Sequence, residues 1–106
     1  MSHTTVNYAN EEALGGALHM LRDPLDCDHL GVSVLDADPG WTGMEHDHAD
    51  DGQEEVYLLV EGAATLDVEG DEVAMGPGDA VRVDAEATRR LEAGDDGARL
   101  VVAGAP

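Results

Sequence analysis

The sequence contains no lysine and no phenylalanine, and it has a single cysteine, Cys27. One cysteine excludes an internal disulfide, and we interpret Cys27 as a structural residue. No apolar run approaches the roughly 18 residues that a membrane-spanning helix needs, and no signal peptide is evident. We therefore expect a cytoplasmic protein that does not bind membranes.

Positive charge is scarce throughout the chain. Five arginines face 24 aspartates and glutamates, which gives a formal net charge of −19 at pH 7. This charge would repel phosphate groups, so nucleic acid and anionic membranes are disfavoured as partners. Disorder is disfavoured as well, because 42% of the residues are hydrophobic and they alternate with polar residues in an ordered way. The composition is typical of adaptation to molar salt, as in halophiles.

From residue 30 onward, apolar residues alternate with polar ones in short runs that Gly, Pro and Asp interrupt. This period of two predicts β-strands. We expect strands at 31–36, 41–46, 55–60, 64–68, 72–75, 80–83, 88–92 and 99–102. At 106 residues the chain has room for one domain with a modest core, and short strands at this density predict a β-barrel or a double-sheet jelly roll.

The N-terminal residues carry a different signal. Residues 10–18 are predicted to form a short helix with Asn10 as its N-cap. The adjacent glycines at 15 and 16 weaken this prediction, because glycine is a poor helix former. We therefore divide the chain into an N-terminal extension with a short helix, 1–29, and a barrel, 30–106.

Two histidines and a glutamate form a candidate metal site. Side chains two residues apart on a strand point to the same face, so we expect His46 and His48 to project together. Glu55 opens the next alternating run, and pairing of the two strands would bring its carboxylate beside the imidazoles. Such a face suits one divalent transition metal, which could be Fe, Mn, Ni, Zn or Co. Two alternatives stay open: a pair of exposed histidines in an acidic loop, and a metal-free pocket.

The spacing of these residues resembles the first sequence motif of the cupin superfamily. That motif contains a glycine, two histidines, a glutamate and a second glycine, and the corresponding residues here are Gly40, His46, His48, Glu55 and Gly62. The gaps before the first histidine and after the glutamate match the family pattern. Six residues separate the second histidine from the glutamate, where three or four are usual, and the loop 49–54 absorbs the surplus.

The second cupin motif is preserved here in spacing more than in chemistry. Gly78 stands in its expected place, but Arg89 occupies the position of the histidine that would supply the last metal ligand. An arginine has no lone pair to donate, so the site offers three ligands at most. Three interpretations of Arg89 stay open: a solvated residue, a cavity residue that binds an anionic ligand through its planar fork, or a partner of Glu55 that displaces the metal.

The resemblance implies an all-β, cupin-type jelly-roll β-barrel with a short N-terminal helical segment. It also implies a small-molecule ligand and a homodimer. Two functions are open. The first is a mononuclear metal-dependent dioxygenase or isomerase acting on a small molecule, an anion if Arg89 faces the cavity. The second is a non-enzymatic binding or sensing cupin with a degenerate or metal-free site. Arg89 and Tyr57 are the candidate substrate contacts.

Molar salt is expected to stabilise the folded chain. Raising KCl from about 0.1 M to about 1 M shortens the Debye length from about 10 Å to about 3 Å, which screens the repulsion among surface carboxylates. Thermal unfolding followed by circular dichroism should therefore show a midpoint that rises with KCl, and NaCl at equal ionic strength should raise it equally. A midpoint that does not depend on salt would contradict the halophilic interpretation.

Overall fold

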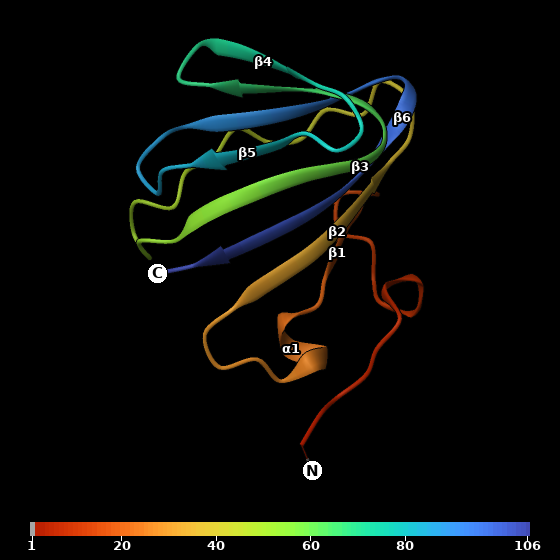
Figure 1. The fold of residues 1–106 in the computed structure, drawn as a ribbon, viewed down its shortest axis with the longest axis vertical. Helices are drawn as coiled ribbons and strands as arrows, with labels where there is room; N and C mark the ends of the chain where they lie inside the picture. Colours follow the sequence, from red (N-terminus) through yellow and green to blue (C-terminus); the bar gives the residue numbers. More distant parts are fainter. Residues whose placement is uncertain (1) are drawn as a thin grey trace.

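The computed structural model describes residues 2–106, which form a curved six-stranded sheet with short helical segments at its N-terminal side (Figure 1). In chain order the elements are the 3-10 helix η1 (Tyr8–Asn10), β1 (Leu18–Met20), α1 (Arg22–Leu25), β2 (Gly31–Ala37), β3 (Glu54–Val68), β4 (Asp71–Met75), β5 (Ala80–Val83) and β6 (Arg89–Ala105). Neighbouring strands pair in the order β1-β2-β6-β3-β4, and β5 pairs with β3. None of the helices in residues 2–106 is long and apolar enough to cross a membrane. The all-β prediction is confirmed.

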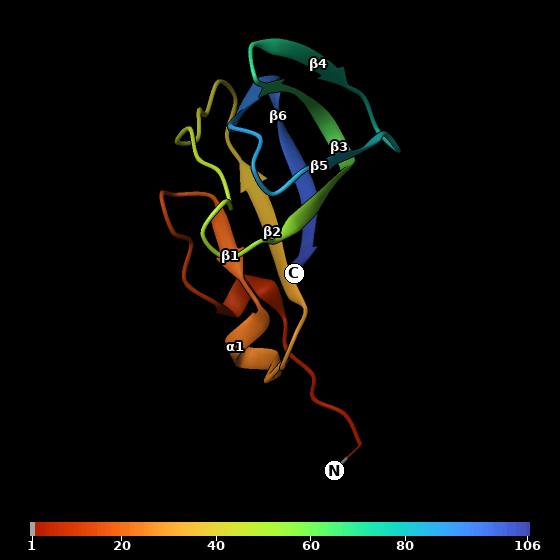
Figure 2. The same cartoon turned by 90° about the vertical axis from the view of Figure 1, so that its left-hand side faces the viewer.

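The two longest strands take part in both layers of the barrel. β3 has 15 residues and β6 has 17, and they pair antiparallel along most of their length. The first half of β3 and the second half of β6 join β1, β2 and β5 in one layer. In the second layer, the other half of β3 pairs with β4, and the other half of β6 forms two isolated bridges with the segment 42–46. Figure 2 shows how the sheet curls, with β4 at the top and β1 and β2 below.

The core lies between these layers and consists mainly of aliphatic side chains. Alternate residues of β3 and β6 point into it, as the period-two pattern predicts. The buried hydrophobic residues that these two strands contribute are Tyr57, Leu59, Ala64, Leu66, Leu91, Ala93, Ala98, Leu100 and Val102. Among residues 2–106, Tyr57 is the one buried aromatic side chain, so Leu, Val and Ala fill most of the core of this phenylalanine-free chain.

Several of the predicted strands are continuous in the structure. Runs 55–60 and 64–68 both belong to β3, and runs 88–92 and 99–102, apart from Thr88, both belong to β6. The interruption in β3 is a pair of register shifts on either side of Gly62. A bulge of this kind bends a strand without ending it, so the glycine marks a corner instead of a boundary.

The segment 41–46 differs from its prediction as a strand. It runs beside β6 but forms only isolated bridges, from Thr42 to Glu92 and from His46 to Arg89. The backbone N–H of Gly43 donates to the carbonyl of Leu91 at 2.8 Å, and the next backbone hydrogen bond to β6 is made by His46. The period-two pattern predicts extended backbone, which is present, but continuous pairing depends on the neighbouring strand.

The helix predicted over 10–18 is wrong in its range, although a short N-terminal helical segment is present. The 3-10 helix covers only Tyr8–Asn10, and Asn7 is its N-cap. The backbone N–H of Leu14 donates to the carbonyl of Leu18 at 2.8 Å, which closes a tight turn. The two glycines inside that turn have φ angles of 60° and 81°, a conformation that a right-handed helix excludes.

Gly62 allows β3 and β6 to approach each other closely at the corner. Its φ is 87°, and a Cβ atom at this position would overlap the carbonyl oxygen of Gly97 in β6. Gly97 has a φ of 80°, and a Cβ atom there would lie 2.8 Å from the carbonyl oxygen of Ala37. The corner therefore requires residues without side chains on both strands.

Replacing Gly62 by alanine is expected to lower the free energy of unfolding by roughly 2 to 4 kcal/mol, because the methyl group meets backbone atoms of the β3–β6 ladder. Gly70→Ala is the matched control. Gly70 has nearly the same φ, 85°, but no atom lies within 4 Å of its Cβ position, so only the backbone strain remains, about 1 kcal/mol. Urea unfolding in molar KCl measures both. Equal losses in the two variants would contradict the role assigned to the close approach.

Candidate functional site

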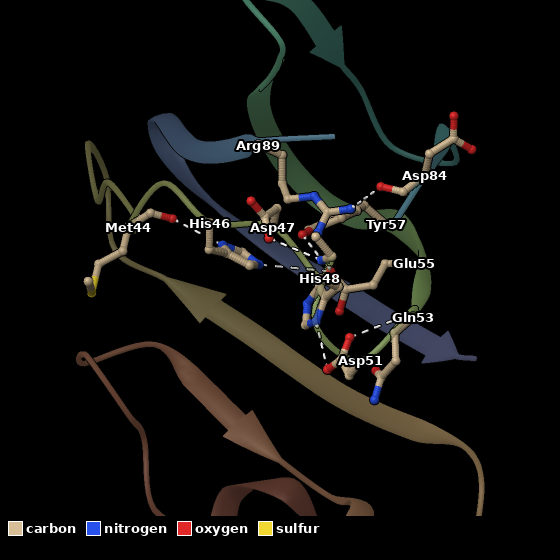
Figure 3. Close-up of polar contacts among 11 residues, drawn as sticks. Met44, His46, Asp47, His48, Asp51, Gln53, Glu55, Tyr57, Asp84 and Arg89 are labelled. Carbon is tan, nitrogen blue, oxygen red and sulfur yellow. Dashed lines mark hydrogen bonds and ion pairs between the residues drawn. The ribbon is translucent and has the colours of Figure 1, made fainter. Parts of the chain in front are cut away.

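His46, His48 and Glu55 converge in the structure (Figure 3). Each offers a ligand atom, and these atoms lie within 4.8 Å of one another. Nε2 of His48 is 3.3 Å from Oε1 of Glu55, and Nε2 of His46 is 3.9 Å from the same oxygen. The imidazole centroids are 5.3 Å apart, with the rings nearly perpendicular. The structure thus brings together the residues that the motif predicted, and metal binding by them stays a prediction.

Backbone hydrogen bonds hold the two histidines in place. His46 and Arg89 exchange a pair of them, at 3.0 and 2.9 Å, and the N–H of His48 donates to the carbonyl of Ala85 at 2.8 Å. Glu55 is the second residue of β3, where that strand pairs with both β5 and β6. The donors therefore come from an extended segment and a strand that are both anchored to the same end of the barrel.

Each imidazole makes a second contact through Nδ1. Nδ1 of His46 lies 3.2 Å from the carbonyl oxygen of Met44, and Nδ1 of His48 lies 3.2 Å from Oδ2 of Asp51. Because both partners accept hydrogen bonds, Nδ1 carries the proton in the neutral rings and Nε2 keeps the lone pair that a ligand needs. A hydrogen bond from the backbone of Gln53, followed by one from His48, lowers the pKa of Asp51. The sequence signal for Asp51 is its place in the enlarged loop of the motif.

The neighbouring side chains share the carboxylate of Glu55. Its side chain is only 14% exposed, and its Oε1 accepts a hydrogen bond of 2.9 Å from the hydroxyl of Tyr57. Burial, and after it the negative charge of Glu55, raises the pKa of Tyr57 far above its usual value. The phenol therefore keeps its proton and donates to the carboxylate.

Arg89 lies inside the barrel, next to Glu55. Its side chain is fully buried, with Nη1 at 3.7 Å from Oε1 of Glu55 and Nη2 donating to the carbonyl of Asp84 at 2.7 Å. The interpretation of Arg89 as a solvated residue is therefore wrong. Neither its Nε nor its Nη1 has a hydrogen-bond partner among the described residues. A buried charge needs compensation, and the carboxylate of Glu55 is the nearby group that supplies it.

A cavity of about 370 Å³ adjoins the three candidate ligands. His46, His48, Glu55 and Tyr57 line it, whereas Arg89 does not. Apolar side chains make up most of the remaining wall, including those of Leu14, Leu18, Met20, Leu35, Trp41 and Leu91. The N-terminal residues thus contribute to the site, which the sequence pattern did not indicate. Tyr57 is placed to touch a ligand, and a contact between Arg89 and a ligand stays a prediction.

The donor set fits a divalent transition metal. Two imidazole nitrogens and one carboxylate oxygen form a facial arrangement that leaves further positions open. Ligand bonds of about 2.1 Å place neighbouring donor atoms roughly 3 Å apart. The separations of 3.3 and 3.9 Å from the two imidazoles to Glu55 are close to that value. The group as a whole spans up to 4.8 Å, so the two imidazoles and the carboxylate would move closer together around an ion.

Solved structures with the same fold identify the class of protein. A cupin protein from Bacteroides fragilis matches with a TM-score of 0.84 at 20% identity, over 99% of this chain and 85% of that chain. A Cupin 2 conserved barrel domain protein from Salinispora arenicola matches with a TM-score of 0.78 at 18% identity, over 100% of this chain and 89% of that chain. These likenesses show that the chain has a cupin fold.

The sequence comparison then gives the family. Residues 33–104 match the family model described as Cupin domain, and the chain belongs to this family. A sugar phosphate isomerase of the cupin superfamily from Silicibacter pomeroyi is also similar, with a TM-score of 0.71 and 25% identity over 84% of this chain and 58% of that chain. No curated protein matches the chain. The resemblance predicted from the first motif is confirmed.

Replacing Arg89 by histidine is expected to tighten metal binding by roughly tenfold or more, because the change removes a positive charge beside the ion and supplies a fourth ligand, which is a third imidazole. Titration with Co²⁺, followed by its visible absorption, measures both the affinity and the change in coordination. Arg90→His is the matched control, since Arg90 is the adjacent residue in the chain but is exposed. Equal Co²⁺ affinity in the wild type and in Arg89→His would contradict the proximity of position 89 to the metal.

Proposed function

We propose that this chain is a metal-dependent cupin that binds and transforms a small molecule beside His46, His48 and Glu55. The supporting observation is that these donors lie within 4.8 Å of one another on the wall of a 370 Å³ cavity. A divalent ion held there would supply Lewis-acid chemistry, polarising an oxygen atom of the ligand. Fe, Mn, Ni, Zn and Co all suit an N/O donor set of this kind.

The surrounding side chains have defined tasks under this proposal. The Nδ1 contacts to Met44 and Asp51 turn Nε2 of each histidine toward Glu55. Tyr57 holds the carboxylate through its 2.9 Å hydrogen bond. Because its pKa is raised, the phenol stays a hydrogen-bond donor at neutral pH and does not act as a base. The apolar part of the cavity wall keeps water away from the body of a bound ligand.

The comparison with solved structures favours an enzyme in which the ion polarises a carbonyl group. The similar protein from Silicibacter pomeroyi is a sugar phosphate isomerase, and 84% of this chain matches it. Isomerisation of a hydroxy-carbonyl compound needs a group that stabilises negative charge on oxygen, which a bound divalent ion provides. A dioxygenase remains the second enzymatic candidate, since the three-ligand face leaves positions for a further ligand.

The buried Arg89 favours a different candidate, a binding or sensing cupin without metal. Nη1 of Arg89 lies 3.7 Å from Oε1 of Glu55, so an arginine already compensates the carboxylate that a metal would use. The same residue stands where the family motif has a histidine ligand. An ion pair with Glu55 and a metal ion compete for one carboxylate, and the measured metal content decides between them.

The test is elemental analysis of the full chain, purified in molar salt without chelator or nickel affinity resin. We expect about one transition metal ion per chain, because the three donors form one site. The double variant His46→Ala, His48→Ala should lose it. The double variant His3→Ala, His29→Ala is the matched control, since both histidines are exposed and neither belongs to the group.

Two outcomes contradict the proposal. The wild type could stay free of metal after incubation with excess Fe²⁺, Mn²⁺ or Zn²⁺, which would favour the metal-free candidate. Alternatively, the His46→Ala, His48→Ala variant could keep its metal, which would place the binding site elsewhere. Circular dichroism of all variants shows whether a loss of metal reflects a loss of folding.

A further inference from the structure

We propose that the cavity takes a ligand with an uncharged hydrocarbon body and a compact oxygen-donor head, and that it rejects ligands whose body carries a phosphate or another anionic group. The head would face His46, His48 and Glu55, and the body would lie against the apolar wall. Only the binding of the oxygen-donor head beside His46, His48 and Glu55 rests on the proposed function. The preference for the body rests on the wall itself.

The polar groups of the cavity are concentrated in one place. His46, His48 and Glu55 lie within 4.8 Å of one another, and the hydroxyl of Tyr57 is bonded to Glu55. Apart from Ser33, the other lining residues offer carbon, sulfur or glycine backbone to a ligand, together with the indole of Trp41. The volume of about 370 Å³ is in the usual range for a small-molecule site.

No arginine among residues 2–106 lines this cavity, and the sequence contains no lysine. Arg82 pairs with Glu54 and Asp84, and Arg99 pairs with Asp36 and Glu61. These exposed pairs use two of the arginines outside the cavity.

The other three arginines do not reach the cavity either. Arg89 is buried against Glu55, the guanidinium of Arg22 donates to the carbonyl of Asp28, and Arg90 is exposed. Recognition of a phosphate depends on arginine, lysine or a helix N-terminus, and the cavity wall offers neither of these side chains. In a chain of net charge −19, an anionic body would meet repulsion without local compensation. This separates the site from one that holds a sugar phosphate.

The N-terminal segment completes the apolar wall. The indole N–H of Trp41 donates to the carbonyl of Gly15 at 2.9 Å and ties this segment to the residues that precede His46. Leu18 and Met20 are held by the pairing of β1 with β2. Leu14 lines the cavity and is 42% exposed, which places it at the opening. We therefore assign Leu14 as a residue that selects for an apolar body.

Three ligands with one head and different bodies test the proposal. Lactate, 3-phenyllactate and 3-phosphoglycerate share an α-hydroxy acid head and carry hydrogen, phenyl and phosphate, respectively, at the third carbon. Their binding to the metal-loaded chain is measured in molar KCl by isothermal titration and by the emission of Trp41, the single tryptophan, which lines the cavity. We expect 3-phenyllactate to bind about tenfold or more tightly than lactate, because the phenyl ring is removed from water. 3-Phosphoglycerate should bind no better than lactate.

A pair of leucine variants locates the body of the ligand. Leu14→Asn should weaken 3-phenyllactate by roughly threefold or more while leaving lactate unchanged, because the apolar contact is lost. Leu30→Asn is the matched control, since Leu30 is 46% exposed but does not line the cavity. Tighter binding of 3-phosphoglycerate than of 3-phenyllactate, or equal effects of the two variants, would overturn the proposal.

A second probe separates this proposal from the metal site. N-phenyl-1-naphthylamine is neutral and becomes fluorescent in apolar surroundings, so it reports the wall without needing a metal. Its emission should rise on binding to the chain both with and without a chelator, and Leu14→Asn should reduce the rise. If the chain holds no metal but the probe still binds in this way, the proposed function fails and the preference for an apolar body stands. Absence of probe binding in both states overturns the preference itself.

Discussion

The antiparallel pairing of β3 with β6 is the interaction on which the positions of Glu55, Arg89 and His46 depend. The two strands pair on both sides of the corner at Gly62, and so they belong to both layers of the barrel. The first half of β3 carries Glu55 into the cavity, and the start of β6 carries Arg89, whose backbone holds His46. A shift of one residue in this pairing would turn Glu55 away from the cavity, because strand side chains alternate between faces.

The electrostatics of the site follow from placing a carboxylate in a partly buried position. Glu55 is compensated by a phenol hydrogen bond from Tyr57 and by the fully buried guanidinium of Arg89. A cupin with a histidine in place of this arginine would have a fourth ligand, a neutral imidazole, and one positive charge fewer. Here the guanidinium of Arg89 lies 3.7 Å from Oε1 of Glu55, and its positive charge weakens the attraction of the site for a divalent ion.

The site joins two environments that suit different halves of a ligand. The donors and Tyr57 form a compact polar cluster, and the rest of the wall is mainly apolar. The outer surface carries a large excess of acidic groups, while the exposed arginines Arg82 and Arg99 are engaged in ion pairs. A small molecule that is polar at one end and apolar at the other satisfies both environments. One that carries a second negative charge does not.

Periodicity and motif spacing were enough to predict the barrel and the group of His46, His48 and Glu55, because both depend on local geometry. The barrel follows from the alternation of side chains along a strand, and the ligand group follows from the fixed distance between side chains two residues apart. The same local signals predict a helix at 10–18, but the two glycines within it form a turn. They also predict a strand at 41–46, but this segment makes only isolated bridges to β6. Only the tertiary structure decided the burial of Arg89 and the use of Leu14 in the cavity wall. Both follow from contacts between residues far apart in the chain, and such contacts leave no periodic signal in the sequence.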